Sequence, residues 1–358
     1  MSTFLRRHGW QLLLGFVPFA VGLAWAAPGR KVAIFVTSVL AILPLAGYIG
    51  RATEELADQL GGGIGGLLNA TFGNAAELII GLFALSEGLT DLVKASITGS
   101  ILGNLLLVFG AAAFAGGLGR PVQRFNRTAA SIGTTMLLLA TIGLVVPAVF
   151  HHIGAGRGLE LQLDTEIAVV LLLTYGASLV FTLRTHRSLY GHQDERAAAP
   201  APAAGGRMRP LLLLLGATAA VAVVSELLVG SVTETAEALG LSQIFVGVIV
   251  VALVGNAAEH YSAVTLAMDD RMDAAIGIAV GSSTQIALFV APVLVFASYV
   301  VGPRPMDLLF STFELVAIGV AVPAITVIAH DGETTWMEGV QLLAVYTILA
   351  LAFFYLPG

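Results

Sequence analysis

Eleven long apolar runs constrain this chain more than any other feature of its sequence. They cover roughly residues 9–27, 31–50, 61–86, 92–118, 128–150, 165–184, 210–229, 241–267, 272–297, 307–329 and 335–356 of the 358. A helix of about 20 apolar residues spans the hydrocarbon core of a bilayer, whereas the strands of a membrane barrel are shorter and alternate in polarity. The runs therefore predict an all-α polytopic membrane protein with about eleven transmembrane helices.

The composition agrees with a chain that lies mostly in lipid. Charged residues make up 11% of the sequence and apolar residues 57%, whereas an ordinary globular domain has roughly 25% charged residues. The chain has no cysteine, which excludes a disulfide scaffold. Its net charge of −6 and its lack of a basic run exclude nucleic acid as a partner. The apolar runs make the lipid bilayer the expected surrounding of the chain.

The basic residues predict the orientation. If the N-terminus is cytoplasmic, 12 of the 17 Lys and Arg residues fall in cytoplasmic segments, and the outer segments hold Arg30, Lys31, Lys94, Arg157 and Arg304. Because cytoplasmic loops carry the excess of positive charge, we expect a cytoplasmic N-terminus, an outer C-terminus and a prokaryotic cytoplasmic membrane. The first run could instead be a cleaved signal ending at Ala24-Trp25-Ala26, but its length favours a retained helix.

The sequence contains an internal repeat. Residues 73–77 and 255–259 both read GNAAE, 182 positions apart, and the Gly-Ser pair at 99–100 recurs at 281–282 with the same offset. Matched helices are five spans apart, an odd number, so they cross the membrane in opposite directions. This predicts two inverted-topology repeats of five helices plus an N-terminal helix, an arrangement that many secondary transporters share.

The predicted domain boundaries follow from the repeat. Residues 1–30 form the N-terminal transmembrane helix, 31–185 the first repeat and 210–358 the second repeat. Residues 186–209 are rich in Ala, Pro and Gly, which is typical of a flexible linker, here cytoplasmic.

Two glutamates lie inside apolar runs, Glu77 in the first repeat and Glu259 in the second. A charge in that position costs at least about 2.5–3.5 kcal/mol, which favours a functional role. Small and polar residues surround both, and matched or neighbouring positions in the fourth and ninth runs add more oxygen atoms. The candidate ligands of a cation are Glu77, Glu259, Asn74, Asn256, Gly73, Gly255, Ser100, Ser282, Gln285 and Asn104.

Carboxylate, amide, hydroxyl and backbone carbonyl oxygens are ligands for hard cations such as Ca²⁺. Zinc or copper would require His or Cys, and only His260 lies within a span. Two nearby carboxylates in a low-dielectric setting also favour the protonated form when the metal is absent. Competition between one divalent cation and protons for the same carboxylates is the physical basis of antiport.

Several polar residues permit other interpretations. His260 is more typical of a core histidine than of a ligand, and Glu226, Glu314 and Glu338 are either interhelical hydrogen-bond partners or proton-path residues. Residues 269–273 spell DDRMD, a DDxxD pattern of the kind that binds Mg²⁺ in membrane prenyltransferases. A second acidic cluster is missing from the other cytoplasmic segments, so a solvated turn is favoured over an enzyme site.

The sequence resembles the calcium/cation–proton antiporters, a family within the calcium/cation antiporter superfamily. The resemblance lies in GNAAELIIGLFAL with GSILGNLLLVFG, in GNAAEHYSAV with GSSTQIALFV, and in FELVAIGVAV at 313–322 and residues 334–354. It implies eleven helices, alternating access and Ca²⁺/H⁺ exchange, with Glu77 and Glu259 as the shared carboxylates beside Asn74, Asn256, Ser100, Ser282 and Gln285. Ca²⁺ and protons are then transported ions, and we expect no resident cofactor and no enzymatic activity.

The chain departs from its relatives in the linker, where only Asp194 and Glu195 replace the strongly acidic stretch that many of them carry. The functional alternative is a Na⁺/Ca²⁺ or other cation exchanger of the same superfamily. Sodium/calcium exchangers typically have Ser, Thr and Pro within the repeat signatures, whereas this chain has Ala-Ala between Asn and Glu. The sequence therefore favours protons over sodium as the counter-ion.

Overall fold

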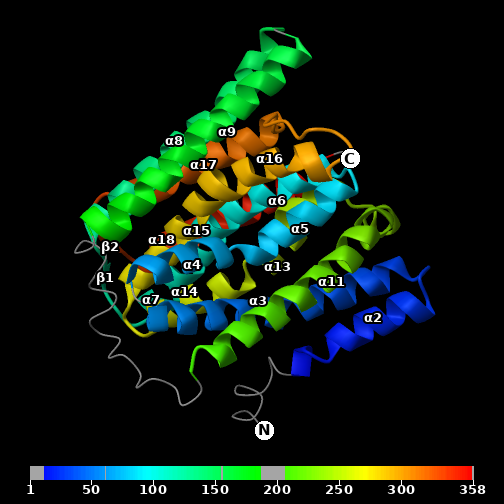
Figure 1. Ribbon diagram of the computed structural model, residues 1–358. Helices are drawn as coiled ribbons and strands as arrows, with labels where there is room; N and C mark the ends of the chain where they lie inside the picture. The colour runs from blue at the N-terminus through cyan, green and yellow to red at the C-terminus, as the bar shows by residue number, and fades with distance from the viewer. Residues whose placement is uncertain (1–11, 61, 155, 187–205, 357–358) are drawn as a thin grey trace.

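The computed structural model describes residues 12–60, 62–154, 156–186 and 206–356, and in this part of the chain the fold is helical apart from one pair of two-residue strands (Figure 1). The elements, with η marking a π-helical turn, are α2 (Phe16–Ala26), α3 (Lys31–Leu60), α4 (Gly62–Phe72), α5 (Ala75–Ser86), α6 (Thr90–Leu102), η1 (Gly103–Val108), α7 (Phe109–Gly117), β1 (Gln123–Arg124), α8 (Arg127–His152), α9 (Arg157–Val180), η2 (Phe181–Thr185), α11 (Met208–Leu239), α12 (Gln243–Phe245), η4 (Val246–Val251), α13 (Ala252–Gly255), α14 (Ala257–Met268), α15 (Met272–Gln285), η5 (Ile286–Val290), α16 (Ala291–Val301), α17 (Thr312–Ala329), β2 (Glu333–Thr334) and α18 (Trp336–Tyr355).

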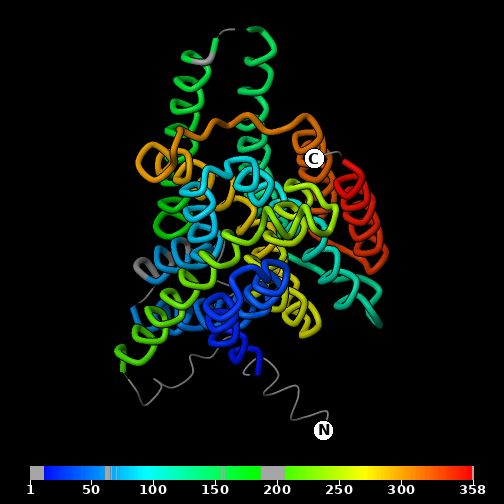
Figure 2. Tube along the Cα trace, turned by 90° about the vertical axis from the view of Figure 1, so that its right-hand side faces the viewer, coloured from blue at the N-terminus to red at the C-terminus, as the bar shows by residue number. Residues whose placement is uncertain are grey.

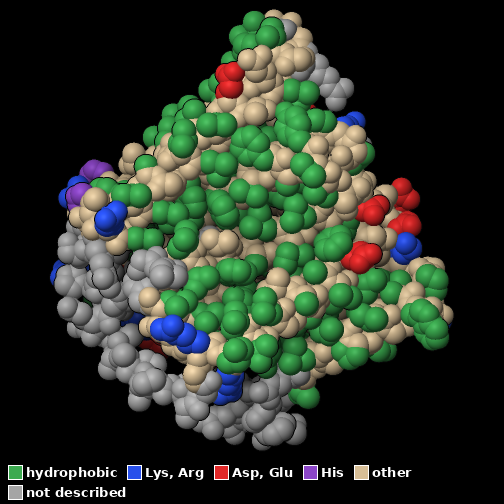
Figure 3. Space-filling model, viewed as in Figure 1, with side chains coloured by type: hydrophobic (Ala, Val, Ile, Leu, Met, Phe, Trp, Pro, Cys, Tyr) green, Lys and Arg blue, Asp and Glu red, His purple; other side chains and the backbone are tan. Residues whose placement is uncertain are grey.

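The helices are long and apolar enough for a multi-pass membrane protein. Among the described residues, eight helical segments could each cross a bilayer, and the bent pair Gln243–Gly255 with Ala257–Met268 makes a ninth. Two further apolar helices, α2 and α5, are shorter. Hydrophobic side chains cover most of the face in Figure 3, and the charged side chains gather toward its margins. This distribution is expected for a surface that contacts lipid.

The centre of the bundle is formed by α6 and its continuation through η1 and α7. The apolar window of the Thr90–Gly117 segment is 83% buried, against 17% for the Gly158–Thr185 segment that begins in α9. The long helices α3 and α11 lie side by side at one flank, and α8 and α9 form a hairpin that projects beyond the rest of the bundle (Figures 1 and 2). The polar residues of α6 are therefore shielded from lipid by the other helices.

Two of the predicted continuous helices are interrupted. The run 61–86 breaks at Asn74 between α4 and α5, and the run 241–267 breaks at Asn256, where the two parts are bent by 61°. Each Asn has a ψ angle near +20° that departs from helical geometry, at 25° and 16°. An interrupted helix is tolerated in a membrane where the freed backbone lines a polar cavity, so both breaks indicate a site.

Two extended segments, which we call strap 1 (residues 118–126) and strap 2 (residues 302–311), join α7 to α8 and α16 to α17. The sequence prediction of a helix over 307–329 is wrong at its start, because the helix begins at Thr312 after a Ser311 cap. Strap 1 contains β1, which pairs antiparallel with β2 (Gln123 with Thr334, Arg124 with Glu333). The straps lie at opposite ends of the bundle, and the two ends are called here the strap-1 face and the strap-2 face (Figures 1 and 2).

Some of the predicted regions lie outside the described residues. These are residues 1–11 of the predicted N-terminal helix and 187–205, most of the predicted linker 186–209. The described segments on either side of 187–205 end in η2 and begin before α11. The proposed division into residues 1–30, 31–185, 186–209 and 210–358 therefore stays a prediction.

Candidate functional site

Each helix break places a glutamate at the start of a new helix. Glu77 lies in the first turn of α5, three residues after Asn74, and Glu259 lies in the first turn of α14, three residues after Asn256. The first turn of a helix has backbone N–H groups without intrahelical partners and the positive end of the helix dipole. The breaks therefore supply a favourable backbone environment for two carboxylates inside an otherwise apolar bundle.

The Glu77 side chain reaches across to the second break. A β-carbon added to Gly255 would lie 3.2 Å from both the Cγ and the Oε1 atoms of Glu77, so a larger residue here would crowd this carboxyl group. Both carboxyl oxygens of Glu77 are buried and have no hydrogen-bond partner. Glu259 lies in the first turn of the helix that follows this break, so the Glu77 carboxyl group lies against the break that carries the second glutamate. The joint role of the two glutamates as ligands stays a prediction.

Asn256 is the centre of a buried hydrogen-bond network. Its Nδ2 donates to Ser100 Oγ (2.8 Å) and to the carbonyl oxygen of Ala252 (2.8 Å), and its Oδ1 accepts from Asn104 Nδ2 (3.1 Å). Ser100, Asn104 and Asn256 are each at most 2% exposed. These bonds tie the second break to α6 and η1, and they confirm that three of the predicted site residues lie together.

Asn74 has a corresponding role at the first break. Its Nδ2 donates to Gln285 Oε1, which ties this break to the end of α15. Ser282 is half-buried one turn before Gln285, and no side-chain hydrogen bond joins it to Asn74. Gly73 lies against its own helix, because a β-carbon there would meet the Asn69 carbonyl oxygen at 2.6 Å. The roles of Ser282 and Gly73 as ligands stay predictions.

The α-helical ladder is also disturbed around these residues. The π-helical turn η1 begins at Gly103, just after Ser100, and η5 begins at Ile286, directly after Gln285. A third π-helical turn, η4, ends at Val251 before the second break. Short π-helical segments are frequent at functional sites because they redirect side chains and free backbone carbonyls.

Two of the glutamates that were either hydrogen-bond partners or proton-path residues stabilise the starts of helices. Glu314 and Glu338 are each the third residue of a capping box, with Ser311 and Thr335 as the respective caps. His260 Nε2 is buried without a hydrogen-bond partner. In the DDxxD segment, Asp270 forms a long ion pair with Arg120 (3.5 Å) and Asp273 accepts a hydrogen bond from the backbone N–H of Asn126, so this segment holds strap 1.

Sequence reasoning missed two charged residues near the site. Glu54 lies in α3 one turn after Gly50, where an added β-carbon would lie 3.9 Å from the β-carbon of Ala258, the residue before Glu259. Lys94 lies in α6, is 8% exposed and bonds to strap 2. Lys94 had a usable signal, because it is a lone cation at the edge of an apolar run and such residues usually have a defined partner. Glu54 was missed because the predicted span ended at residue 50, whereas α3 continues to Leu60.

The donor set suits a hard cation. The residues at and around the two breaks offer carboxyl, amide, hydroxyl and backbone carbonyl oxygens, which is the oxygen-rich chemistry that Ca²⁺ binds. Among the described residues no group of three or more His, Asp and Glu side chains converges on one point. Amide and backbone oxygens would therefore have to complete the shell around a metal ion.

These features define a class of protein: a multi-pass helical membrane protein with two interrupted helices, each of which resumes with a glutamate in its first turn. The sequence profile of the sodium/calcium exchanger protein family matches residues 30–184 and again residues 209–355. The chain belongs to this family.

Individual relatives cover nearly the whole chain. A Ca(2+)/H(+) antiporter of Aphanothece halophytica is 46% identical over 360 residues, with 96% of each chain covered. The Ca(2+)/H(+) antiporter ChaA of Bacillus subtilis is 48% identical over 328 residues, covering 90% of this chain and 92% of the relative. Among solved structures, native YfkE superposes with a TM-score of 0.84 at 43% identity, covering 97% of this chain and all of YfkE.

The fold is shared more widely than the sequence. A crystal structure of the H⁺/Ca²⁺ exchanger CAX superposes with a TM-score of 0.69 at 16% identity. The sodium–calcium exchanger NCX_Mj superposes with a TM-score of 0.55 at 19% identity over 92% of this chain. At these identities the likeness concerns the arrangement of the helices alone.

Proposed function

We propose that the protein is a secondary active transporter that exchanges Ca²⁺ for protons across a membrane by alternating access. Relatives at 46% and 48% identity are Ca²⁺/H⁺ antiporters, so the chain is a transporter and not an enzyme. Within the site, Glu77 and Glu259 are the carboxylates that Ca²⁺ and protons share. The observation that carries this assignment is the buried Glu77 carboxyl group, which has no hydrogen-bond partner and lies against the opposite helix break at Gly255.

The exchange follows from the chemistry of a buried carboxylate pair. Without a cation, two interacting carboxyl groups in a low-dielectric surrounding favour the protonated, uncharged form. A Ca²⁺ ion bound between them supplies two positive charges and expels the protons. Amide oxygens of Asn74, Asn256 and Gln285 would complete the coordination, together with the Ser100 hydroxyl and the carbonyls of Gly73 and Gly255. Asn104 holds Asn256 in place (3.1 Å), and Ser282 lies one turn from Gln285.

The finer architecture is part of this proposal: eleven transmembrane helices and two inverted repeats, residues 31–185 and 210–358. One family profile matches the two halves separately, and both halves have a helix broken at the Asn of GNAAE. The straps extend the similarity, because each contains an Arg-Pro pair (120–121 and 304–305) and ends in a helix-capping residue, Asn126 or Ser311. Counting α2 and the joined pair α4–α5 as spans gives the eleven.

The orientation is likewise a proposal. The strap-1 face carries Arg120, Arg124 and Arg127, and the excess of basic residues expected on the inner side of a membrane supports a cytoplasmic position for this face. The strap-2 face, with Lys94 and Arg304, is then the outer face. The outward transport of Ca²⁺ would be driven by protons that enter through the same site.

A flux assay in reconstituted vesicles tests the proposed function. An acidic interior should drive Ca²⁺ uptake into the vesicles, and dissipation of the pH gradient by a protonophore should stop it. The alternative, exchange of Ca²⁺ for Na⁺, is tested in the same vesicles with an internal sodium load at constant pH. Equal uptake with the sodium gradient alone would contradict the assignment of protons as the counter-ion.

A further inference from the structure

On the strap-2 side of the site, α6 and η4 cross and pack closely against each other. A β-carbon on Gly99 of α6 would collide with the Val248 carbonyl group of η4, and one on Gly247 would lie 2.6 Å from Ala95 Cβ. At the position of the other half that matches Gly99, a β-carbon on Gly281 would meet no atom within 4 Å. The close contact of Gly99 with the backbone of η4 therefore has no equivalent at Gly281.

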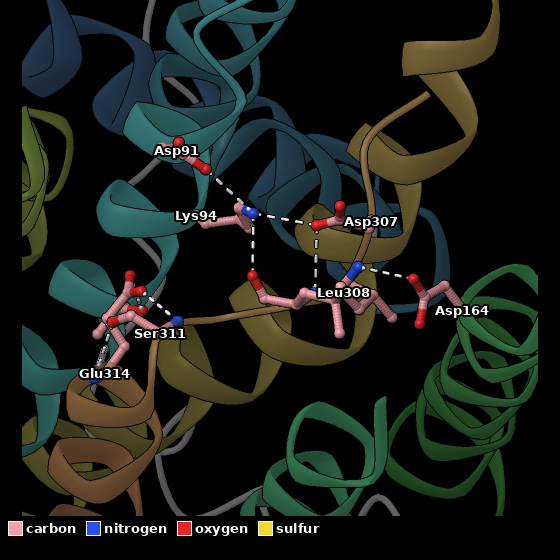
Figure 4. A network of polar contacts seen from close by, with 9 residues as sticks. Asp91, Lys94, Asp164, Asp307, Leu308, Ser311 and Glu314 are labelled. Carbon is pink, nitrogen blue, oxygen red and sulfur yellow. Dashed lines mark hydrogen bonds and ion pairs between the residues drawn. The ribbon is translucent and has the colours of Figure 1, made fainter. Parts of the chain in front are cut away.

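The same helix α6 carries a buried lysine one residue before this crossing. The Lys94 Nζ atom donates to Asp307 Oδ1 (3.0 Å) and to the carbonyl oxygen of Leu309 (2.9 Å), both in strap 2, and it pairs with Asp91 Oδ1 of α6 (3.1 Å) (Figure 4). Its side chain is only 10% exposed. A charge-assisted bond that is shielded from water is stronger than a surface ion pair, so this contact joins α6 firmly to the strap.

Strap 2 itself is fixed at several other points, which makes it a rigid anchor. The backbone N–H of Met306 donates to Ser298 Oγ (2.8 Å) and that of Leu308 to Asp164 Oδ2 (3.1 Å). At its end, Glu314 Oε2 accepts from the Ser311 backbone N–H (2.9 Å) (Figure 4). Because the strap is held on both sides, breaking the Lys94 contacts should free α6 rather than the strap.

A cavity lies outside the crossing on this face. It has a volume of about 380 Å³, and its lining includes Asp91, Lys94, Ile244, Ser311 and Glu314. Ile244 belongs to α12, which leads directly into η4. The cavity therefore lies between strap 2, the start of α6 and α12, beside the contacts of Lys94.

We propose that Lys94 is a latch of the strap-2 face, that is, a residue whose contacts must break before the site opens toward this face. Its ammonium group, bound between Asp91 and strap 2, keeps α6 packed on η4. This inference rests on the proposed function, because alternating access requires such an opening. Lys94 is a positioning residue that binds no transported ion.

The test measures access to the site rather than transport, which keeps it separate from the proposed function. The chain has no cysteine of its own, so Ser96→Cys, in α6 one turn from Ser100, provides a single reporter thiol. A small, positively charged, membrane-impermeant thiol reagent is added to one side of reconstituted vesicles. Arg304→Cys, at an exposed position of strap 2, identifies in parallel which side carries the strap-2 face.

We expect Lys94→Gln to accelerate labelling of the thiol from the strap-2 face at least about tenfold, and Lys94→Arg to keep it slow. The matched control is Lys31→Gln. Lys31 is the only other lysine, and it also joins two helices, through Gly230 O (2.9 Å) and Glu234 (3.4 Å), but it lies in α3. Its loss should leave labelling unchanged.

Equal labelling rates in Lys94→Gln and Lys31→Gln would overturn the proposal. Should Lys94→Gln fail to fold, Asp307→Asn removes the charged partner in the strap without altering α6. Lys94 then keeps only the bond to the Leu309 carbonyl oxygen in the strap, so accelerated labelling is again expected. Slow labelling in a folded Asp307→Asn protein would then refute the latch. Ca²⁺/H⁺ exchange that fails in the unaltered protein, with labelling as expected, would instead refute the proposed function alone.

Discussion

At the scale of single residues, Glu77 is unusual because a buried carboxyl group is left without a hydrogen-bond partner. An unsatisfied buried polar group costs about 1–3 kcal/mol of folding free energy, and more when it is charged. A residue that lowers stability in this way is expected where the missing partner is a ligand. The sequence indicated the position of Glu77, but not that its side chain crosses to Gly255.

Glu77→Gln should therefore separate stability from ion binding. Without Ca²⁺, we expect the variant to unfold at the same temperature as the unaltered protein or above it. The amide is uncharged at every pH, whereas the buried carboxyl group must bind a proton to become uncharged. Saturating Ca²⁺ at about 100 times its dissociation constant stabilises a protein by about 2.7 kcal/mol, and the variant should lose this thermal shift. Thermal unfolding in detergent, with and without Ca²⁺, provides the measurement.

The control for this variant is Glu87→Gln, which makes the same chemical change at an exposed position just after α5. It should keep the full Ca²⁺-dependent shift. A Glu77→Gln protein that still gained stability from Ca²⁺ would show that this carboxylate is not a ligand.

At the scale of helices, the sequence predicted most spans and missed how they are interrupted. Apolar length locates a membrane helix because lipid requires it, and α8 and α18 lie close to their predicted runs. The breaks at Asn74 and Asn256 leave the apolar pattern unchanged, so hydropathy could not reveal them. Residues 307–311 of strap 2 were predicted as helix because Leu308 and Phe310 are apolar, although both are buried in an extended segment.

The crossing of α6 with η4 predicts opposite outcomes for two matched glycines. Gly99→Ala places a methyl group into the Val248 backbone, whereas Gly281→Ala enters open space. Overpacking typically costs about 1–3 kcal/mol, so Gly99→Ala should lower the unfolding temperature measurably while Gly281→Ala changes stability by less than about 0.5 kcal/mol. Thermal unfolding of both variants checks this. Equal destabilisation would contradict the difference in packing between Gly99 and Gly281.

At the scale of the whole molecule, the repeat in the sequence was the most informative feature. The offset of 182 between the two GNAAE segments predicted that two carboxylates would meet, and the Glu77 side chain does reach the break at Gly255 that precedes Glu259. Pairings between the halves were harder to predict. Matching Asn256 to Ser100 would suggest Asn74 with Ser282, yet Asn74 binds Gln285. The two halves therefore pack differently at matched positions, and the repeat in the sequence does not specify this difference.

The contacts of each strap with the other half of the chain were also not predicted from the sequence. Strap 1 of the first half pairs through β1 with β2 of the second half, and strap 2 of the second half is held by Lys94 and Asp164 of the first. These contacts join residues more than 140 positions apart. Short extended segments carry neither helical periodicity nor sufficient apolar length, so their partners become visible only in three dimensions.

Proton release on Ca²⁺ binding tests the central claim most directly. Purified protein in weakly buffered detergent solution near neutral pH should release protons when Ca²⁺ is added, up to two for each ion bound. The Glu77→Gln, Glu259→Gln double variant should release none. Ca²⁺ binding to the unaltered protein, measured by calorimetry, with no change in proton concentration would contradict exchange at a shared carboxylate pair.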